Sequence, residues 1–135
     1  MNYPQELLRD IYWSFANGTF SSQKKFLKEL KKYYKEIAGN EIPLDLDKVI
    51  YPYPKMVIQY MKYNYADEDW DEPQVLLRSE EEKGFTAGEL LYKIHNTIGK
   101  HLATEDNCYF EGLTFGTDQD PDYPDTAVYF LDTGT

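Results

Sequence analysis

The segment from Gly84 to Leu102 constrains the fold more than any other stretch, because it combines a strong helix start signal with one apolar stripe. Thr86 can cap the helix N-terminus, and Glu89, three residues later, can reach back to the Thr86 N–H and close a capping box. Phe85 and Leu90 fit the hydrophobic staple that accompanies this motif. The apolar residues that follow at helical spacing are Leu90, Leu91, Ile94, Ile98 and Leu102. We therefore expect an amphipathic helix over about 86–102, around which the rest of the chain packs.

The length and composition indicate a folded single domain spanning residues 1–135. Apolar residues make up 41% of the chain and aromatic residues 16%, which argues against disorder. Cys108 is the only cysteine, so no internal disulfide can form. The N-terminus does not resemble a secretory signal, and no apolar run approaches the roughly 20 residues that cross a bilayer. We expect a cytoplasmic protein that does not bind membranes.

The N-terminal part of the chain predicts a pair of antiparallel helices. The first covers residues 4–17, with a face of Leu7, Leu8, Ile11, Tyr12 and Phe15. The second begins after Ser21 or Ser22 and ends near Ala38, with an apolar stripe of Phe26, Leu27, Leu30, Tyr33, Tyr34 and Ile37. Its other face is basic, with Lys24, Lys25, Lys28, Lys31, Lys32 and Lys35. We interpret this face as solvated, or as paired with acidic residues of the same molecule or of a second copy.

The remaining elements are read as strands and loops. Three prolines in 40–55 favour a connecting loop, with at most one turn of helix near 46–50. Residues 56–65 favour a strand, although Val57, Ile58 and Met61 also fit a helical face. Further strands are expected at 74–79, 108–115 and 126–132, with a bulge at Gly112 and an antiparallel hairpin between the last two. The fold class is α+β, with a mostly antiparallel sheet.

Charge is distributed unevenly along the chain. Residues 1–50 contain eight Lys and Arg against seven Asp and Glu, whereas residues 51–135 contain six against seventeen. An acidic surface of this kind repels nucleic acid and anionic membranes and attracts basic proteins. The alternative is that the acidic residues serve only to keep the protein in solution.

Two acidic segments, each with an aromatic residue among carboxylates, are the candidate partner-binding sites. An aromatic anchor among acids suits an interface with a basic protein, because the ring supplies buried contact area and the charges accelerate association. The candidate residues are Asp67, Glu68, Asp69, Trp70, Asp71 and Glu72 in one segment, and Asp118, Asp120, Asp122, Tyr123 and Asp125 in the other.

The sequence contains no motif that names a reaction, a metal or a cofactor. The acidic stretch from Asp118 has Tyr123 and Tyr129 where an EF-hand needs Gly and Glu. His95 and His101 are six residues apart and cannot share a metal ion on one helix face. We therefore expect no cofactor and no catalytic residue. A small enzyme with a site near Glu111, His95 and Cys108 remains an alternative, as does a self-associating structural or adaptor protein.

A resemblance adds a more specific expectation. Residues 85–96, Phe-Thr-Ala-Gly-Glu-Leu-Leu-Tyr-Lys-Ile-His-Asn, followed by Tyr-Phe-Glu-Gly-Leu at 109–113, resemble a pattern in small bacterial proteins. Some of these are similar to the immunity proteins of polymorphic toxins, including those of contact-dependent inhibition systems. The resemblance implies a bacterial, non-enzymatic protein that neutralises a basic, nuclease-like toxin domain by direct binding. A homodimer is a further partner that the lysine face leaves open.

Overall fold

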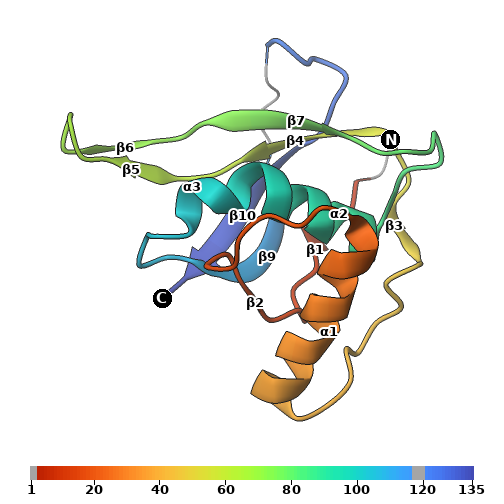
Figure 1. The fold of residues 1–135 in the computed structure, drawn as a ribbon. Helices are drawn as coiled ribbons and strands as arrows, with labels where there is room; N and C mark the ends of the chain where they lie inside the picture. The colour runs from red at the N-terminus through yellow and green to blue at the C-terminus, as the bar shows by residue number, and fades with distance from the viewer. Residues whose placement is uncertain (1–2, 117–120) are drawn as a thin grey trace.

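A mixed β-sheet and two principal helices make up the fold shown in Figure 1. The computed structural model describes residues 3–116 and 121–135. In chain order the elements are β1 (Glu6–Leu7), β2 (Trp13–Ser14), α1 (Gln23–Ala38), β3 (Val49–Tyr51), β4 (Lys55–Gln59), β5 (Lys62–Asn64), β6 (Asp69–Asp71), β7 (Gln74–Arg78), β8 (Phe85–Thr86), α2 (Ala87–Ile94), a π-helical turn (His95–Gly99), α3 (Lys100–Leu102), β9 (Tyr109–Phe115) and β10 (Val128–Gly134). The predicted α+β class is confirmed.

The main sheet has the strand order β1-β9-β10-β4-β7, with β2 also paired to β9. The pairings are antiparallel except that of β10 with β4, which is parallel and aligns Val128 with Val57. The strands predicted at 74–79, 108–115 and 126–132 are present, and β9 and β10 form the predicted antiparallel pair. The strand predicted over 56–65 is divided into β4 and β5, which belong to different sheets. Glu111 has no partner in the register between Gly112 and Phe110, so the bulge predicted at Gly112 is confirmed.

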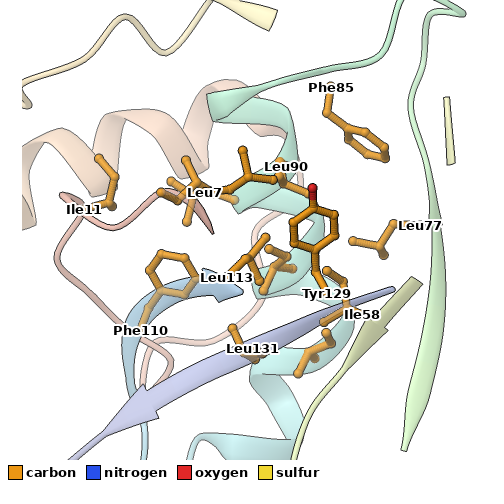
Figure 2. Packing of buried hydrophobic residues seen from close by; sticks show 14 of the residues in the cluster. Leu7, Ile11, Ile58, Leu77, Phe85, Leu90, Phe110, Leu113, Tyr129 and Leu131 are labelled. Atoms are coloured by element: carbon orange, nitrogen blue, oxygen red, sulfur yellow. The ribbon is translucent and has the colours of Figure 1, made fainter. Parts of the chain in front are cut away.

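The helix that begins at Thr86 is present and its apolar stripe forms the centre of the core. Leu90, Leu91, Ile94 and Ile98 are each at most 1% exposed. Figure 2 shows Leu90 beside Leu7 of β1 and Tyr129 of β10, with Leu77 of β7 on the other side of the Tyr129 ring. The helix continues through the π-helical turn to Leu102, as the sequence predicts.

Only half of the predicted capping box forms. The Thr86 hydroxyl accepts a hydrogen bond from the Glu89 N–H at 3.1 Å. The Glu89 carboxylate does not close the box but accepts the Glu80 N–H at 2.8 Å and pairs with Lys93 at 3.0 Å. Burial explains the difference, because a carboxylate that is only 8% exposed needs a charged partner.

The predicted N-terminal helical pair is wrong. Residues 4–17 form the short strands β1 and β2, which pair with β9 in place of a first helix. Ile11, Trp13 and Phe15 are all buried, at the spacing of two that a strand requires, while Tyr12 is 51% exposed. Pairing with β9, about a hundred residues later in the chain, overrides the local helical pattern.

The second predicted helix is confirmed as α1. The Ser22 side chain accepts the Lys25 N–H at its start, and Gly39 ends it in the left-handed conformation, with φ 74°. Its buried residues are Phe26, Leu30 and Tyr34. Ile37, predicted to lie on the apolar stripe, is instead 61% exposed.

Two loop predictions need correction. The turn of helix expected near 46–50 is replaced by β3, which pairs with β8. The acidic run 67–72 lies on the surface as predicted, but residues 69–71 form the strand β6.

Candidate functional site

The clearest surface feature is a hairpin of β5 and β6 that extends beyond the ends of β4 and β7, on the left of Figure 1. Tyr63 lies directly opposite Trp70, and Lys62 and Asn64 lie opposite Asp71 and Asp69. Because successive strand residues point to opposite faces, Tyr63 and Trp70 share one face of this ribbon and the two aspartates share the other. The hairpin therefore has an aromatic face and an acidic face.

The aromatic face lines a hollow of about 280 Å³. The Tyr63 ring contacts Tyr65 at 4.9 Å and Trp70 at 5.2 Å between centroids, at interplanar angles of 81° and 71°. The hollow is completed by Met61 and by residues at the end of the helix, the loop after it and the C-terminus: Leu102, Glu105, Asp106, Asn107 and Thr135. Tyr65 is 72% and Trp70 47% exposed, so large aromatic surface is open to solvent here.

The acidic face is held in place by Asn64. Its side-chain Nδ2 donates to Asp67 at 3.1 Å and to Asp71 at 3.2 Å, and its Oδ1 accepts the N–H groups of Ala66 and Asp67. These bonds fix the turn and hold two carboxylates close together. Among the residues that the structure describes, no Lys or Arg forms an ion pair within 4.0 Å of a hairpin carboxylate, and Lys62, opposite Asp71, is the one cation in the two strands.

A carboxylate also reaches the hollow from the other side. The Tyr65 hydroxyl donates to Glu105 Oε2 at 3.2 Å. The negative charge of Glu105, its hydrogen bond to the hydroxyl, and the charge of Asp106 raise the pKa of Tyr65. The potential inside the hollow is therefore unfavourable to added negative charge and favourable to a cation.

The hollow continues into a wider depression of about 560 Å³, which shares Met61, Trp70 and Asn107 with it. Asp132 lies there but is paired with Arg9 at 2.7 Å. Glu111 is exposed in the same depression and forms no ion pair with a described residue. The whole groove combines aromatic and acidic groups.

The second predicted acidic segment lies at the other end of the sheet. β10 is parallel to β4, so residues 121–127, which precede β10, lie near the start of β4, whereas the hairpin follows its end. Asp125 lines a separate hollow with Tyr3 and Tyr51, and Tyr123 is 36% exposed. Asp118 and Asp120 lie outside the described residues. Of the run 67–72, the structure thus brings Trp70 into one hollow with Glu105 and Asp106, whereas Asp122, Tyr123 and Asp125 lie elsewhere.

The three residues of the enzymatic alternative occupy different environments. His95 is 1% exposed, and its ring nitrogens are bonded to the Trp13 indole and the Gly18 carbonyl. Glu111 lies in a depression whose lining includes neither His95 nor Cys108. Cys108 is partly buried and accepts the Phe15 N–H through its backbone carbonyl.

The lysines of α1 form a second charged surface. All six are exposed, and within the described part of the chain Lys35 alone among them pairs with a carboxylate, Glu41 at 3.9 Å. Figure 1 shows α1 well apart from the β5–β6 hairpin. The molecule therefore carries a basic and an acidic surface at separate places.

Residues 3–116 and 121–135 contain no group of three His, Cys, Asp or Glu side chains arranged to hold a metal ion. None of their helices has the length and apolar character needed to cross a membrane.

Sequence reasoning identified Trp70 and its acidic neighbours but missed the other half of the site. Met61, Tyr63 and Tyr65 alternate with polar residues, and this period of two could have placed them on one strand face. No local pattern could have placed Glu105 and Asp106 there, because the helix end brings them to the hairpin from 40 residues away.

No protein-family model matches this sequence, and no curated protein or solved structure is similar to it.

Proposed function

We propose that this chain is a non-enzymatic binding protein that docks on a basic protein through its β5–β6 hairpin. The more specific form of this proposal is that the partner is a cationic toxin domain, such as a nuclease, which the chain neutralises as an immunity protein does. The observation that carries the proposal is the presence, on one protruding hairpin, of exposed aromatic rings and of carboxylates that outnumber its cations and form no ion pair with a described residue.

The two faces of the hairpin have complementary roles in such an interface. The rings of Tyr65 and Trp70 offer large apolar area with few rotatable bonds, as binding hot spots do. Asp67, Asp69 and Asp71 create a negative potential that steers a basic partner toward the rings. The bonds from Asn64 organise the turn before binding, which lowers the entropic cost of association.

A phosphate-binding groove is a natural target for this surface. Nucleases hold the phosphates of their substrate with Lys and Arg side chains. The carboxylates of the hairpin can bind these basic side chains in place of the phosphates. The binding protein then needs no catalytic group, since covering the groove excludes the substrate.

The test is the rate of association with a purified basic toxin domain, starting with the product of the neighbouring gene, at low and high salt. The variant D69N/D71N removes two charges from the acidic face. The matched control E81Q/E82Q removes two charges from the loop after β7, at the other end of the sheet. We expect D69N/D71N to slow association roughly tenfold at low salt and the control to change it little. Equal rates for both variants would refute the electrostatic role of the hairpin.

Self-association is a second candidate, favoured by the five lysines of α1 that form no ion pair with a described residue. The lysine face of one copy could meet the acidic hairpin of another. Sedimentation at low and high salt distinguishes the two candidates. Salt-sensitive oligomers of the isolated chain, lost in D69N/D71N, would support self-association, and a monomer at low salt would exclude it.

A further inference from the structure

The geometry of the hollow beneath the hairpin points to a receptor for one arginine side chain of the partner. This inference rests on the proposed function, since it names the group of the basic protein that the hairpin binds. It assigns a role to Tyr63, Tyr65, Trp70 and Glu105 that is distinct from the steering role of the outer aspartates.

The planes of the three rings are not stacked in parallel but meet at steep angles. Tyr63 is nearly perpendicular to both Tyr65 and Trp70, and all three line the same hollow. Rings set in this way can surround a guest on several sides, and the electron-rich face of an aromatic ring attracts a cation within about 6 Å. Tryptophan and tyrosine are the aromatic residues with the strongest attraction of this kind.

Carboxylates complete the site. Glu105 Oε2 accepts the Tyr65 hydroxyl, which leaves its second oxygen available, and Asp106 lines the same hollow. No described Lys or Arg lies within 4.0 Å of either carboxylate. The pKa of His101 is lowered chiefly by burial, and to a smaller extent by the positive charges of Lys62 and Lys100. The negative charge within the hollow therefore has no cation paired with it in the described part of the chain.

A guanidinium suits this hollow better than an ammonium. It is planar and weakly hydrated, it stacks on aromatic faces, and it donates in a fork that a carboxylate can accept. A lysine ammonium is a strongly hydrated point charge that loses more on entering an aromatic hollow. The volume of about 280 Å³ is sufficient for one such side chain.

The experiment uses the full chain and three small probes: N-acetyl-L-arginine methylamide, its lysine counterpart, and the citrulline analogue, which has nearly the shape of arginine without the charge. The readout is the indole N–H signal of Trp70 in ¹H–¹⁵N spectra. Trp13, which is 1% exposed, is the second tryptophan of the chain and serves as an internal control. We expect the arginine probe to shift the Trp70 signal with millimolar affinity, and to leave the Trp13 signal in place.

Two variants test the assignment of residues. We expect W70L and E105Q each to weaken binding of the arginine probe, roughly three- to tenfold, because each removes one attractive wall or charge. With W70L the readout moves to the backbone N–H of Tyr63. The control is E82Q, at an exposed glutamate in the loop after β7, at the other end of the sheet. Unchanged positions of the Trp13 signal show that each variant is folded.

Three outcomes would overturn the inference: equal binding of the arginine and citrulline probes, tighter binding of the lysine probe, or undiminished binding by both W70L and E105Q.

Failure of the inference is separable from failure of the proposed function. If D69N/D71N slows docking on a basic domain while W70L and E105Q leave its affinity unchanged, the hairpin docks without an arginine receptor. If the arginine probe binds and no basic domain does, only the proposed function fails.

Discussion

The indole N–H of Trp13 donates a hydrogen bond to Nδ1 of His95 at 3.0 Å, and both side chains are 1% exposed. Because Nδ1 accepts this bond, the ring proton lies on Nε2, which donates to the Gly18 carbonyl at 2.8 Å. The two bonds tie the N-terminal segment to the π-helical turn. They also hold the imidazole neutral, since a proton on Nδ1 would face the indole N–H.

The first prediction is that this pair makes the protein less stable in acid. Burial lowers the pKa of His95, against a smaller opposing effect of the Gly18 bond. Below pH 6.5 the unfolded chain therefore binds a proton that the folded chain does not. The contribution of His95 to the free energy of unfolding is thus fully present above pH 6.5 and is lost as the pH drops below it. One such proton contributes a slope of at most about 1.4 kcal/mol per pH unit.

Urea unfolding at pH 7.5, 6.0 and 5.0 measures this slope, and H95F should reduce it. His101 also has a lowered pKa, chiefly through burial, so H101Q is the control that isolates the contribution of His95. An unchanged pH dependence in H95F would contradict the prediction.

The second prediction concerns the donor of the same bond. In W13F the histidine Nδ1 loses its partner inside the core, and the smaller ring leaves unfilled space. A buried polar atom without a partner costs about 1–3 kcal/mol, and the cavity adds to this cost. We expect chemical denaturation to show a loss of at least ~2 kcal/mol. Y12F, at an exposed position that contacts Tyr34, should change stability little.

Local signals in the sequence predicted the helices well where their ends are set by adjacent residues. Ser22 caps the start of α1, Gly39 caps its end, and Thr86 caps the start of α2. These caps could be identified because capping depends on residues within one turn. The same reasoning failed for residues 4–17. There Leu7 pairs with Leu113 and Trp13 with Phe110, and contacts so distant in the chain leave no local pattern.

The candidate site likewise combines features that adjacent residues determine with features that depend on pairing between distant segments. The acidic run with Trp70 is contiguous and could be identified from sequence, whereas its aromatic partners depend on the register of β5 with β6. The separation of the hairpin from residues 122–125 depends on the parallel pairing of β4 with β10, which joins segments about 70 residues apart. Composition alone therefore indicated two acidic segments but not which of them shares a surface with Glu105.

The third prediction is that Gly84 does not tolerate a side chain. Its φ is 117°, and an added Cβ would clash with the Tyr51 carbonyl oxygen and approach the Pro52 Cα at 2.8 Å. The unfavourable backbone conformation alone costs about 1–3 kcal/mol, and the neighbouring atoms belong to the backbone of β3 and the loop after it. G84A should lower the free energy of unfolding by more than ~2 kcal/mol. In G18A the added Cβ meets nothing within 4 Å, so that variant should unfold almost as the parent does.

The fourth prediction concerns the buried carboxylate of Glu89, which accepts the Glu80 N–H and pairs with Lys93. E89Q keeps the shape but removes the charge, so the half-buried Lys93 ammonium retains only the exposed Glu80 as an ionic partner. We expect a loss of about 1.5–3 kcal/mol, the range for hydrogen bonds to charged groups. Thermal unfolding of E89Q beside E82Q, which alters an exposed glutamate, measures it. Equal melting temperatures would show that this pair contributes nothing.

The fifth prediction tests the potential in the hollow directly, without any ligand. Glu105 is the largest cause of the raised pKa of Tyr65, and Asp106 contributes less. E105Q removes the charge and replaces the anionic acceptor of the Tyr65 hydroxyl with a neutral amide, so the phenolate becomes easier to form and the pKa should fall toward 10.0. D106N should lower it by a smaller amount. A pH titration of ¹³C-labelled tyrosine by NMR, with the Tyr65 signal assigned through Y65F, follows this ring alone. A larger shift in D106N than in E105Q would place the dominant charge elsewhere and remove Glu105 from the cation site.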